Sequence, residues 1–270
     1  MGDSQAGIDS IETGMRLLTA LAERRRPQML KTLAADAGMA PAKAHRYMVS
    51  FVRVGYVDRE PESGLYRLGP ASLHLGLAAL GGTDALELGT QVICELRDEL
   101  NQTMAMMVWG NRGATIVRIE EAGQPVTINS RPGTVLPLLA SASGQVFAAF
   151  LPEQMIAPIL GAEIAENRKT GDPRLITSMD KAKLIIADVK RRGIGRVTGE
   201  TTPGIHALAV PVFDYRRQPV LALAGMGLGG HIDSKWNGAL AQRLKEAAHV
   251  LSRRLGYEDE APTAVLKLVR

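Results

Sequence analysis

The sequence predicts an α+β protein of two domains: a winged helix-turn-helix over residues 1–80, then a domain of sheet and helices over residues 83–257. The first third of the chain places apolar residues mainly at helical spacing, and a longer series of strand patterns begins after residue 100. A length of 270 residues is enough for two cores of ordinary size. Residues 83–100 are the expected linker helix, and residues 258–270 the expected tail.

Composition narrows the class of protein. Hydrophobic residues make up 46% and charged residues 22% of the chain, as in soluble globular proteins. No apolar run approaches the ~18 residues that a membrane helix needs, and the polar N-terminus is not a secretory signal, so we expect a cytoplasmic protein. The single cysteine, Cys94, excludes an internal disulfide and is expected to be a buried apolar residue.

Three helices are predicted within the first 54 residues. The first, residues 8–24, would bury Ile11, Met15, Leu18, Leu21 and Ala22. The second, residues 29–37, would bury Leu30, Leu33, Ala34 and Ala37, and it ends at Gly38. Pro41 then opens a third helix, where its missing N–H costs nothing. Two helices joined by a tight turn that contains glycine are typical of a helix-turn-helix.

The third helix has one cationic side. Lys43, Arg46, Ser50 and Arg53 share that side, and the other side carries Ala44, Tyr47, Met48, Phe51 and Val52. Two short strands, residues 55–59 and 65–68, follow around a turn at residues 61–64, as in a wing. Residues 15–70 hold ten Lys/Arg against five Asp/Glu, although the net charge of the chain is only +4.

These features favour DNA as the partner of the first domain. The recognition helix of such a domain lies in the major groove with its N-terminal residues nearest the bases, and Lys or Arg can pair with guanine edges or bind phosphate. The predicted contacts are Ala42, Lys43, His45 and Arg46 at the helix start, Arg53 along it, and Arg59 and Arg67 on the wing. By itself, the cationic stripe also fits an ordinary solvated helix face.

The remaining elements are predicted in order from periodicity and turn residues. Helical patterns run from residue 70 to 100 with a break at Gly81-Gly82, and two strands follow within residues 102–123. Residues 124–137 are expected to be a strand and a loop. Residues 141–154 and 178–193 are expected to be helices, residues 206–227 a hairpin of two apolar strands, and residues 234–256 a long amphipathic helix.

Four segments resemble the IclR family of bacterial transcription regulators. At the N-terminal end they are IETGMRLLTALAE and LAADAGMAPAKAHRYMVSFVRVGYVDREPESGLYRLGPASLHLG, and in the second half LPLLASASGQVFAAFLPE and TTPGIHALAVPVFD. The similarity spans roughly residues 8–255. It implies a GAF-like effector-binding domain after the winged domain, and a homodimer, often paired into a tetramer, on a partly palindromic double-stranded DNA operator.

The chain departs from the family pattern in the DNA-binding region. Ala42-Lys43 stands where relatives often carry Ser-Thr, and Thr32 stands where an acidic residue is common in the preceding helix. At Ala42-Lys43, two hydroxyls are lost and a cation is gained, so hydrogen bonds are exchanged for charge. The operator sequence therefore differs from those of relatives, and the sequence leaves open whether the protein is a repressor or an activator.

The resemblance also implies a pocket for a small carboxylic acid. Its loop would include Ile128, and the start of the following helix would supply Ala142 and Ser143, where backbone N–H groups favour an anion. On the hairpin, alternation makes Ile205, Ala207, Ala224 and Met226 point inward, with His206 pointing the other way. Glu200 would orient a loop or a ligand hydroxyl, or else be a solvated carboxylate.

The wall of that pocket favours an aromatic or partly apolar acid. Family members that sense glyoxylate or pyruvate present serines where this chain has Ala224 and Met226, and those hydroxyls bind a small polar acid. Met104, Met106 and Met107 could line the cavity or belong to the core.

The sequence leaves two rival functions to consider beside a DNA-binding regulator: an enzyme, and a sensor without DNA binding. An enzyme is disfavoured because G-x-S-x-G, P-loop and H-E-x-x-H motifs are absent and the five histidines lack metal-ligand spacing, so no cofactor or metal is expected. The second rival is a ligand sensor or protein-interaction module that no longer binds DNA. Salt-dependent DNA binding would distinguish a regulator from this sensor.

Overall fold

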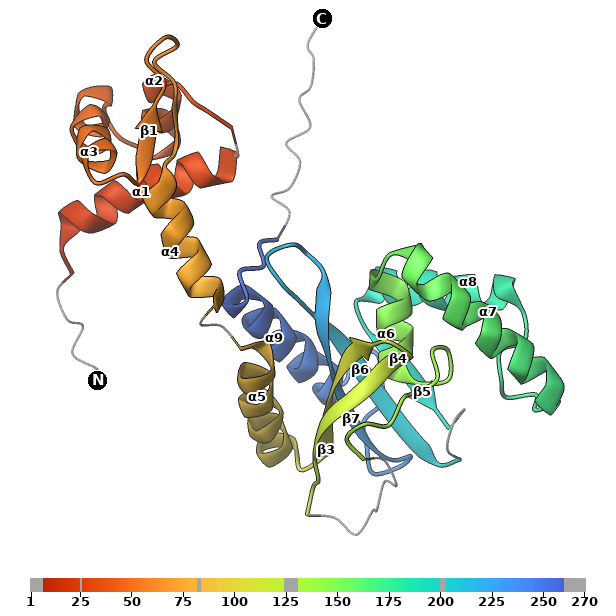
Figure 1. Cartoon of the computed structure of the whole chain (residues 1–270). Coiled ribbons are helices and arrows are strands. Elements are labelled where there is room, and N and C mark those ends of the chain that lie inside the picture. Colours follow the sequence, from red (N-terminus) through yellow and green to blue (C-terminus); the bar gives the residue numbers. More distant parts are fainter. Residues whose placement is uncertain (1–6, 25, 82–83, 124–130, 200–202, 260–270) are drawn as a thin grey trace, which may run out of the picture. The chain divides into compact units, whose positions relative to one another are not determined.

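The computed structural model describes residues 7–24, 26–81, 84–123, 131–199 and 203–259 (Figure 1). It divides into two compact units, residues 1–83 and residues 84–270. In the described part of the chain, no helix is long and apolar enough to cross a membrane. Each unit has its own hydrophobic core.

The N-terminal unit is the predicted winged helix-turn-helix. Its elements in order are α1 (Asp9–Arg24), α2 (Leu30–Asp36), α3 (Pro41–Arg53), β1 (Val57–Arg59), β2 (Tyr66–Leu68) and α4 (Pro70–Gly81). The two wing strands pair antiparallel, with Val57 opposite Leu68. Gln28 exchanges two backbone hydrogen bonds with Tyr66, at 2.9 and 2.8 Å, which the sequence did not predict. This bridge fixes the wing to the segment between α1 and α2.

The buried face of α1 differs from the prediction. Ile11 and Met15 are 59% and 47% exposed, and Ala22 is exposed as well. The helix instead buries Thr13, Gly14, Leu17, Leu18, Ala20 and Leu21. The reason lies at Gly14, where an added Cβ would be 3.1 Å from the rings of Tyr47 and Phe51 on α3. The two helices therefore meet at a glycine, which a search for apolar residues overlooks.

The C-terminal unit is built on a five-stranded antiparallel sheet of order β4-β3-β7-β6-β5. Its strands are β3 (Thr103–Gly110), β4 (Gly113–Glu120), β5 (Gly195–Thr198), β6 (Ile205–Phe213) and β7 (Pro219–Leu228). Helices α5 (Ala85–Leu100) and α9 (Ala239–Arg254) pack on one face, and α6 (Ala142–Phe150) packs on the other (Figure 1). Helices α7 (Glu153–Thr170) and α8 (Met179–Arg192) pack beside α6 over a further apolar cluster.

Several sequence expectations were wrong in this unit. Helix α7 was not predicted, because Pro158 lies inside it and proline normally interrupts a helix. Strand β5 was missed because it has only four residues. Helix α9 begins at Ala239, after a turn at residues 236–237, rather than at Ser234. Of the strand and loop expected over residues 124–137, the first seven residues lie outside the described ranges, and Val135 forms an isolated bridge to Thr115.

Candidate DNA-binding surface and effector site

The turn before α3 determines how that helix is presented. Gly38 has a φ of +63°, a left-handed conformation that favours glycine. Its N–H donates to the carbonyl of Ala35, and the next N–H, of Met39, donates to Ala34. Pro41 then occupies the first turn of α3. The sequence thus ends α2 and starts α3 within five residues.

The cationic side of α3 faces solvent. Ala44 and Met48 are fully buried against α1 and α2, and Val52 in the last turn is 39% exposed, contrary to expectation. The residues predicted to contact DNA are exposed on this helix: Ala42, Lys43, His45, Arg46 and Arg53. Thr32, on the preceding helix α2, is half-buried. The helix can therefore enter a groove without unpacking its core side.

The cations of α3 are available for phosphate or base edges. Within the described residues, Lys43, Arg46 and Arg53 form no ion pair. By contrast, Arg24 on α1 is held by two hydrogen bonds of 2.9 Å to Asp36 on α2, and this bonding raises its pKa. Arg24 therefore stabilises the packing of α1 on α2, whereas the cations of α3, which pair with no acid among the described residues, are available to neutralise phosphates.

The wing carries two further arginines that the sequence singled out. The guanidinium of Arg59 lies 5.5 Å from the ring centre of Tyr66, which orients it by a cation–π contact. Arg67 forms an exposed ion pair of 3.4 Å with Asp58 on the facing strand. Both side chains are exposed. The wing thus presents one arginine oriented by an aromatic ring and one that a solvated carboxylate partly neutralises.

The structure brings the predicted hairpin residues of the effector site to one face of the sheet. Ala207 and Met226 are direct partners in the β6–β7 ladder, and Ala224 is opposite Ala105 on β3. All three pack in the cluster that contains Ala142 of α6. Ile205 belongs to the same face by alternation. These side chains and α6 therefore form a continuous apolar wall.

The three methionines of β3 do not all belong to this wall. Met107 lies on the α6 face, but Met104 and Met106 pack against α5 and α9 on the opposite face. Of the two alternatives that the sequence left open, the core is therefore correct for Met104 and Met106, because residues 104 and 106 point to the opposite face of the strand from residue 107. His206 also points away from the wall, and its Nδ1 is 3.0 Å from the hydroxyl of Ser234.

The start of α6 is held by polar contacts. Ser141 caps the helix: its Oγ accepts from the Gly144 N–H at 3.0 Å and donates to the Pro137 carbonyl. Buried Gln145 donates to the Leu139 carbonyl at 2.9 Å and accepts from the Arg196 N–H of β5 at 3.1 Å. Ser143, in the first turn, is 3% exposed. The position of this turn relative to the wall is therefore fixed from several sides.

A carboxylate of α7 completes that support. The Glu163 side chain accepts hydrogen bonds from two consecutive backbone N–H groups that precede α6, those of Leu138 and Leu139. The sequence did not indicate Glu163 or Gln145, because their partners are remote in the chain. Two predicted site residues, Ile128 and Glu200, lie outside the described residues.

We expect Gly195→Ala to displace the first turn of α6. An added Cβ at Gly195 would be 2.3 Å from the Ala142 carbonyl oxygen, a backbone atom. Overpacking of this kind costs about 1–3 kcal/mol of unfolding free energy, measurable by urea unfolding followed by tryptophan fluorescence. The matched control is Gly161→Ala on α7, where nothing lies within 4 Å and alanine suits a helix better. Equal stability of the two variants would show that β5 tolerates a side chain here.

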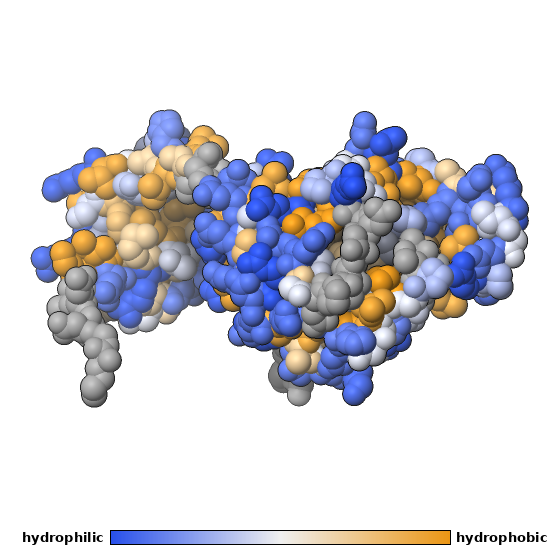
Figure 2. Space-filling model, turned by 90° about the horizontal axis from the view of Figure 1, so that it is seen from below, coloured by the Kyte–Doolittle hydropathy of each residue, from blue (hydrophilic) through white to orange (hydrophobic). Residues whose placement is uncertain are grey.

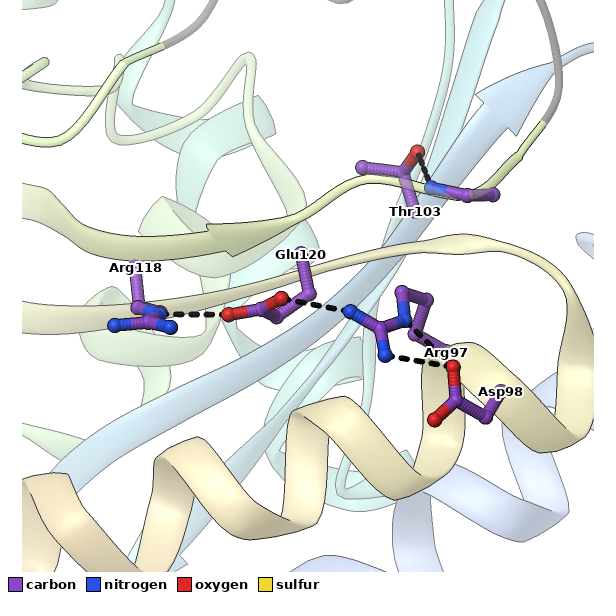
Figure 3. A network of polar contacts seen from close by, with 6 residues as sticks. Arg97, Asp98, Thr103, Arg118 and Glu120 are labelled. Atoms are coloured by element: carbon purple, nitrogen blue, oxygen red, sulfur yellow. Dashed lines mark hydrogen bonds and ion pairs between the residues drawn. The ribbon is translucent and has the colours of Figure 1, made fainter.

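A network of ion pairs joins α5 to the sheet (Figure 3). Glu120, at the end of β4, accepts from Arg97 of α5 at 2.8 Å and from Arg118 at 2.7 Å. Beside it, the N–H of Ala122 donates to Thr103 at 3.2 Å. Burial, together with the nearby Glu120 carboxylate, raises the pKa of the half-buried Cys94 thiol. The network fixes α5, the first helix of this unit, to the strand that carries Glu120.

Family comparison decides what these two units are. Residues 10–61 match the family model described as the IclR helix-turn-helix domain, and residues 77–253 match that of the bacterial transcriptional regulator IclR C-terminal domain. The chain belongs to the IclR family. It is therefore a ligand-responsive, DNA-binding transcriptional regulator, with operator recognition in the first unit and effector binding in the second.

Individual relatives in the IclR family agree over nearly the whole chain. The glycerol operon regulatory protein of Streptomyces griseus is 29% identical over 262 residues, covering 92% of this chain and 97% of that protein. The crystal structure of Pseudomonas aeruginosa HmgR has a TM-score of 0.81 and 37% identity, covering 93% and 99% of the two chains. The structure of an IclR homolog from Microbacterium hydrocarbonoxydans, complexed with 4-hydroxybenzoate, has a TM-score of 0.52 and 20% identity, covering 91% of this chain and 98% of that chain. At that identity, the likeness shows a common fold.

Proposed function

We propose that the effector of this regulator is an aromatic carboxylic acid. The observation that carries the proposal is the wall formed by Ala207, Ala224 and Met226, which offers methyl and thioether groups and no hydrogen-bonding side-chain atom. A flat apolar ring gains from burial against such a wall, at roughly 25 cal/mol for each Å² removed from water. A two-carbon acid has little apolar surface to bury there.

The carboxylate of the acid would bind at the start of α6. The first N–H groups of a helix have no partner within the helix, and the helix dipole favours an anion there. Ala142 and Ser143 supply these groups next to the wall, and Ser141, Gln145 and Glu163 hold the turn in place. The relative from Microbacterium hydrocarbonoxydans supports the proposal, since the same fold holds 4-hydroxybenzoate there.

The regulator is proposed to act as a homodimer or tetramer on a partly palindromic operator. Apolar area is available for self-association: on the face seen in Figure 2, the N-terminal unit, at the left, carries a broad apolar region. Exposed large apolar side chains of this unit include Ile11, Met15, Leu73 and Leu77. Patches of this kind mark protein–protein contacts. Effector binding would then change the spacing of two winged domains, with a coupling of ~1–3 kcal/mol.

A thermal-shift screen tests the effector class. The protein would be heated with glyoxylate, pyruvate, dicarboxylates or hydroxybenzoates, and we expect only aromatic acids to raise the melting temperature. An acid at 100 times its dissociation constant adds about 2.7 kcal/mol of stability. Met226→Ser should weaken hydroxybenzoate binding about tenfold, since roughly 1.4 kcal/mol of apolar contact is lost. Met155→Ser, the same substitution at an exposed methionine of α7 that lies away from the wall, is the control.

Two results would contradict the proposal. A melting-temperature increase with glyoxylate or pyruvate alone would mean that polar groups elsewhere define the pocket. An unchanged hydroxybenzoate affinity in the Met226→Ser variant would mean that the acid binds away from this wall.

A further inference from the structure

A second hollow of the C-terminal unit shares no residue with the effector wall. It has a volume of about 370 Å³ and lies where the end of α8, the outer side of α9 and the end of β6 meet. Three aromatic and five basic side chains belong to its lining: Phe150, Phe213, Tyr257, Lys190, Arg191, Arg192, Lys245 and His249. The volume is in the range of small-ligand sites.

The aromatic residues of the hollow form a stack that stays partly exposed. The rings of Phe213 and Tyr257 are 5.2 Å apart with planes 26° from parallel, and Phe150 meets Phe213 edge-on at 5.3 Å. All three side chains are half-buried. Aromatic residues make up only 4% of the chain, so three of them at one surface hollow is a marked concentration. A planar ring could extend this stack.

The basic residues of the hollow are not neutralised equally. Arg191 and Arg192, which also border it, are both paired with Asp188. Within the described residues, Lys190 and Lys245 have no ion-pair partner. The acid in the lining is Asp259, 3.9 Å from His249. The hollow therefore keeps an excess of positive charge beside its aromatic stack.

Helix dipoles explain only part of this charge. Lys190 is in the last turn of α8, where a cation is stabilised by the helix C-terminus. Lys245 is in the middle of α9, where the dipole offers no such stabilisation, and it lies one turn before His249 on the same side. Lys245 is exposed, so its ammonium group is accessible to a ligand in the hollow.

We propose that this hollow is a second ligand site and that it binds a nucleoside phosphate. The base extends the stack of Phe213 and Tyr257 by packing on the outer face of Tyr257, and the phosphates contact Lys190 and Lys245. The lining fits a ligand that has both a ring and phosphates. A simple anion would make no contact with the aromatic rings, and an uncharged ring would make no contact with the lysines. Stacking on aromatic side chains beside cations is a general mode of nucleotide recognition. The site would be occupied independently of the aromatic-acid site.

The test is equilibrium binding of ADP and ATP to the full-length protein, with adenosine and inorganic pyrophosphate as partial ligands. We expect ADP to bind more tightly than either partial ligand. Lys245→Ala should weaken ADP binding about tenfold, and Tyr257→Ala should weaken it by a similar factor. Tyr257→Phe keeps the ring and should retain affinity. The control is Lys181→Ala, an exposed lysine in the first turn of α8.

Several outcomes would overturn the proposal. The first is no saturable binding of ADP or ATP at millimolar concentration. The second is pyrophosphate binding as tight as that of ADP, since the rings would then contribute nothing. The third is an equal loss of affinity in Lys181→Ala and Lys245→Ala, which would indicate diffuse attraction of anions. Circular dichroism and the response to aromatic acids would verify that each variant is folded.

Discussion

Replacing Arg46 by alanine should weaken operator binding by about 1–3 kcal/mol, roughly 5- to 150-fold. Arg46 lies on the exposed side of α3 near its N-terminal end, where a recognition helix approaches base edges. It makes no ion pair within the described part of the chain, so the mutation breaks no intramolecular pair. The loss should therefore appear in DNA affinity and leave the melting temperature nearly unchanged. Fluorescence anisotropy with DNA from upstream of the gene measures it.

The salt dependence of the same measurement decides what Arg46 contacts. If Arg46 binds phosphate, the plot of log affinity against log salt should become less steep: its negative slope should lose about one unit of magnitude in the variant. If it pairs with a guanine, the slope should change less and the affinity loss should be confined to the specific site. Lys181→Ala removes a cation from the other unit and serves as the charge-matched control. Unchanged operator affinity in Arg46→Ala would favour a sensor that no longer binds DNA.

The winged domain was the part of the fold that sequence reasoning could predict best. Its elements are short, and residues with a clear conformational preference mark their ends. Gly38, with a positive φ, follows α2, and Pro41 starts α3. The buried face of α1 was mistaken because Gly14, which has no side chain, marks the contact with α3. Helix α7 was missed because proline is unfavourable inside a helix, and Pro158 lies inside this one. The packing of α7 over the apolar cluster beside α6 compensates for that cost.

For the candidate effector site, the sequence correctly predicted which strand residues share a face of the sheet, but it did not predict the groups that hold α6 in place. Strand alternation is a local rule, so it correctly grouped Ala207 with Met226 and excluded His206. The groups that hold α6 act over long separations: Glu163 bonds backbone 24 and 25 residues away, and Gln145 bonds a strand 51 residues away. The spacing of apolar residues along the chain gives no information about such contacts. Only the folded structure brings these residues together.

Phe147→Ala should be among the most destabilising single changes in the C-terminal unit, with a cost of about 3–5 kcal/mol. Phe147 is fully buried on α6, and its ring centre is 5.7 Å from that of Trp109 on β3. Truncation would leave a cavity between α6 and the sheet, which the surrounding backbone cannot fill because Ser141, Gln145 and Glu163 hold the start of the helix. Both tryptophans of the chain, Trp109 and Trp236, lie in this unit, so tryptophan fluorescence during urea unfolding reports on it selectively.

The control for this variant is Leu184→Ala on α8, whose side chain is 72% exposed and should change stability by less than about 0.5 kcal/mol. The effector proposal adds a second expected result. Because the apolar wall and the first turn of α6 are positioned by the same packing, Phe147→Ala should weaken hydroxybenzoate binding even at temperatures where the unit stays folded. Operator binding without effector should be unaffected, since the winged unit has its own core. A Phe147→Ala protein that kept both full stability and full hydroxybenzoate affinity would mean that α6 does not define the effector site.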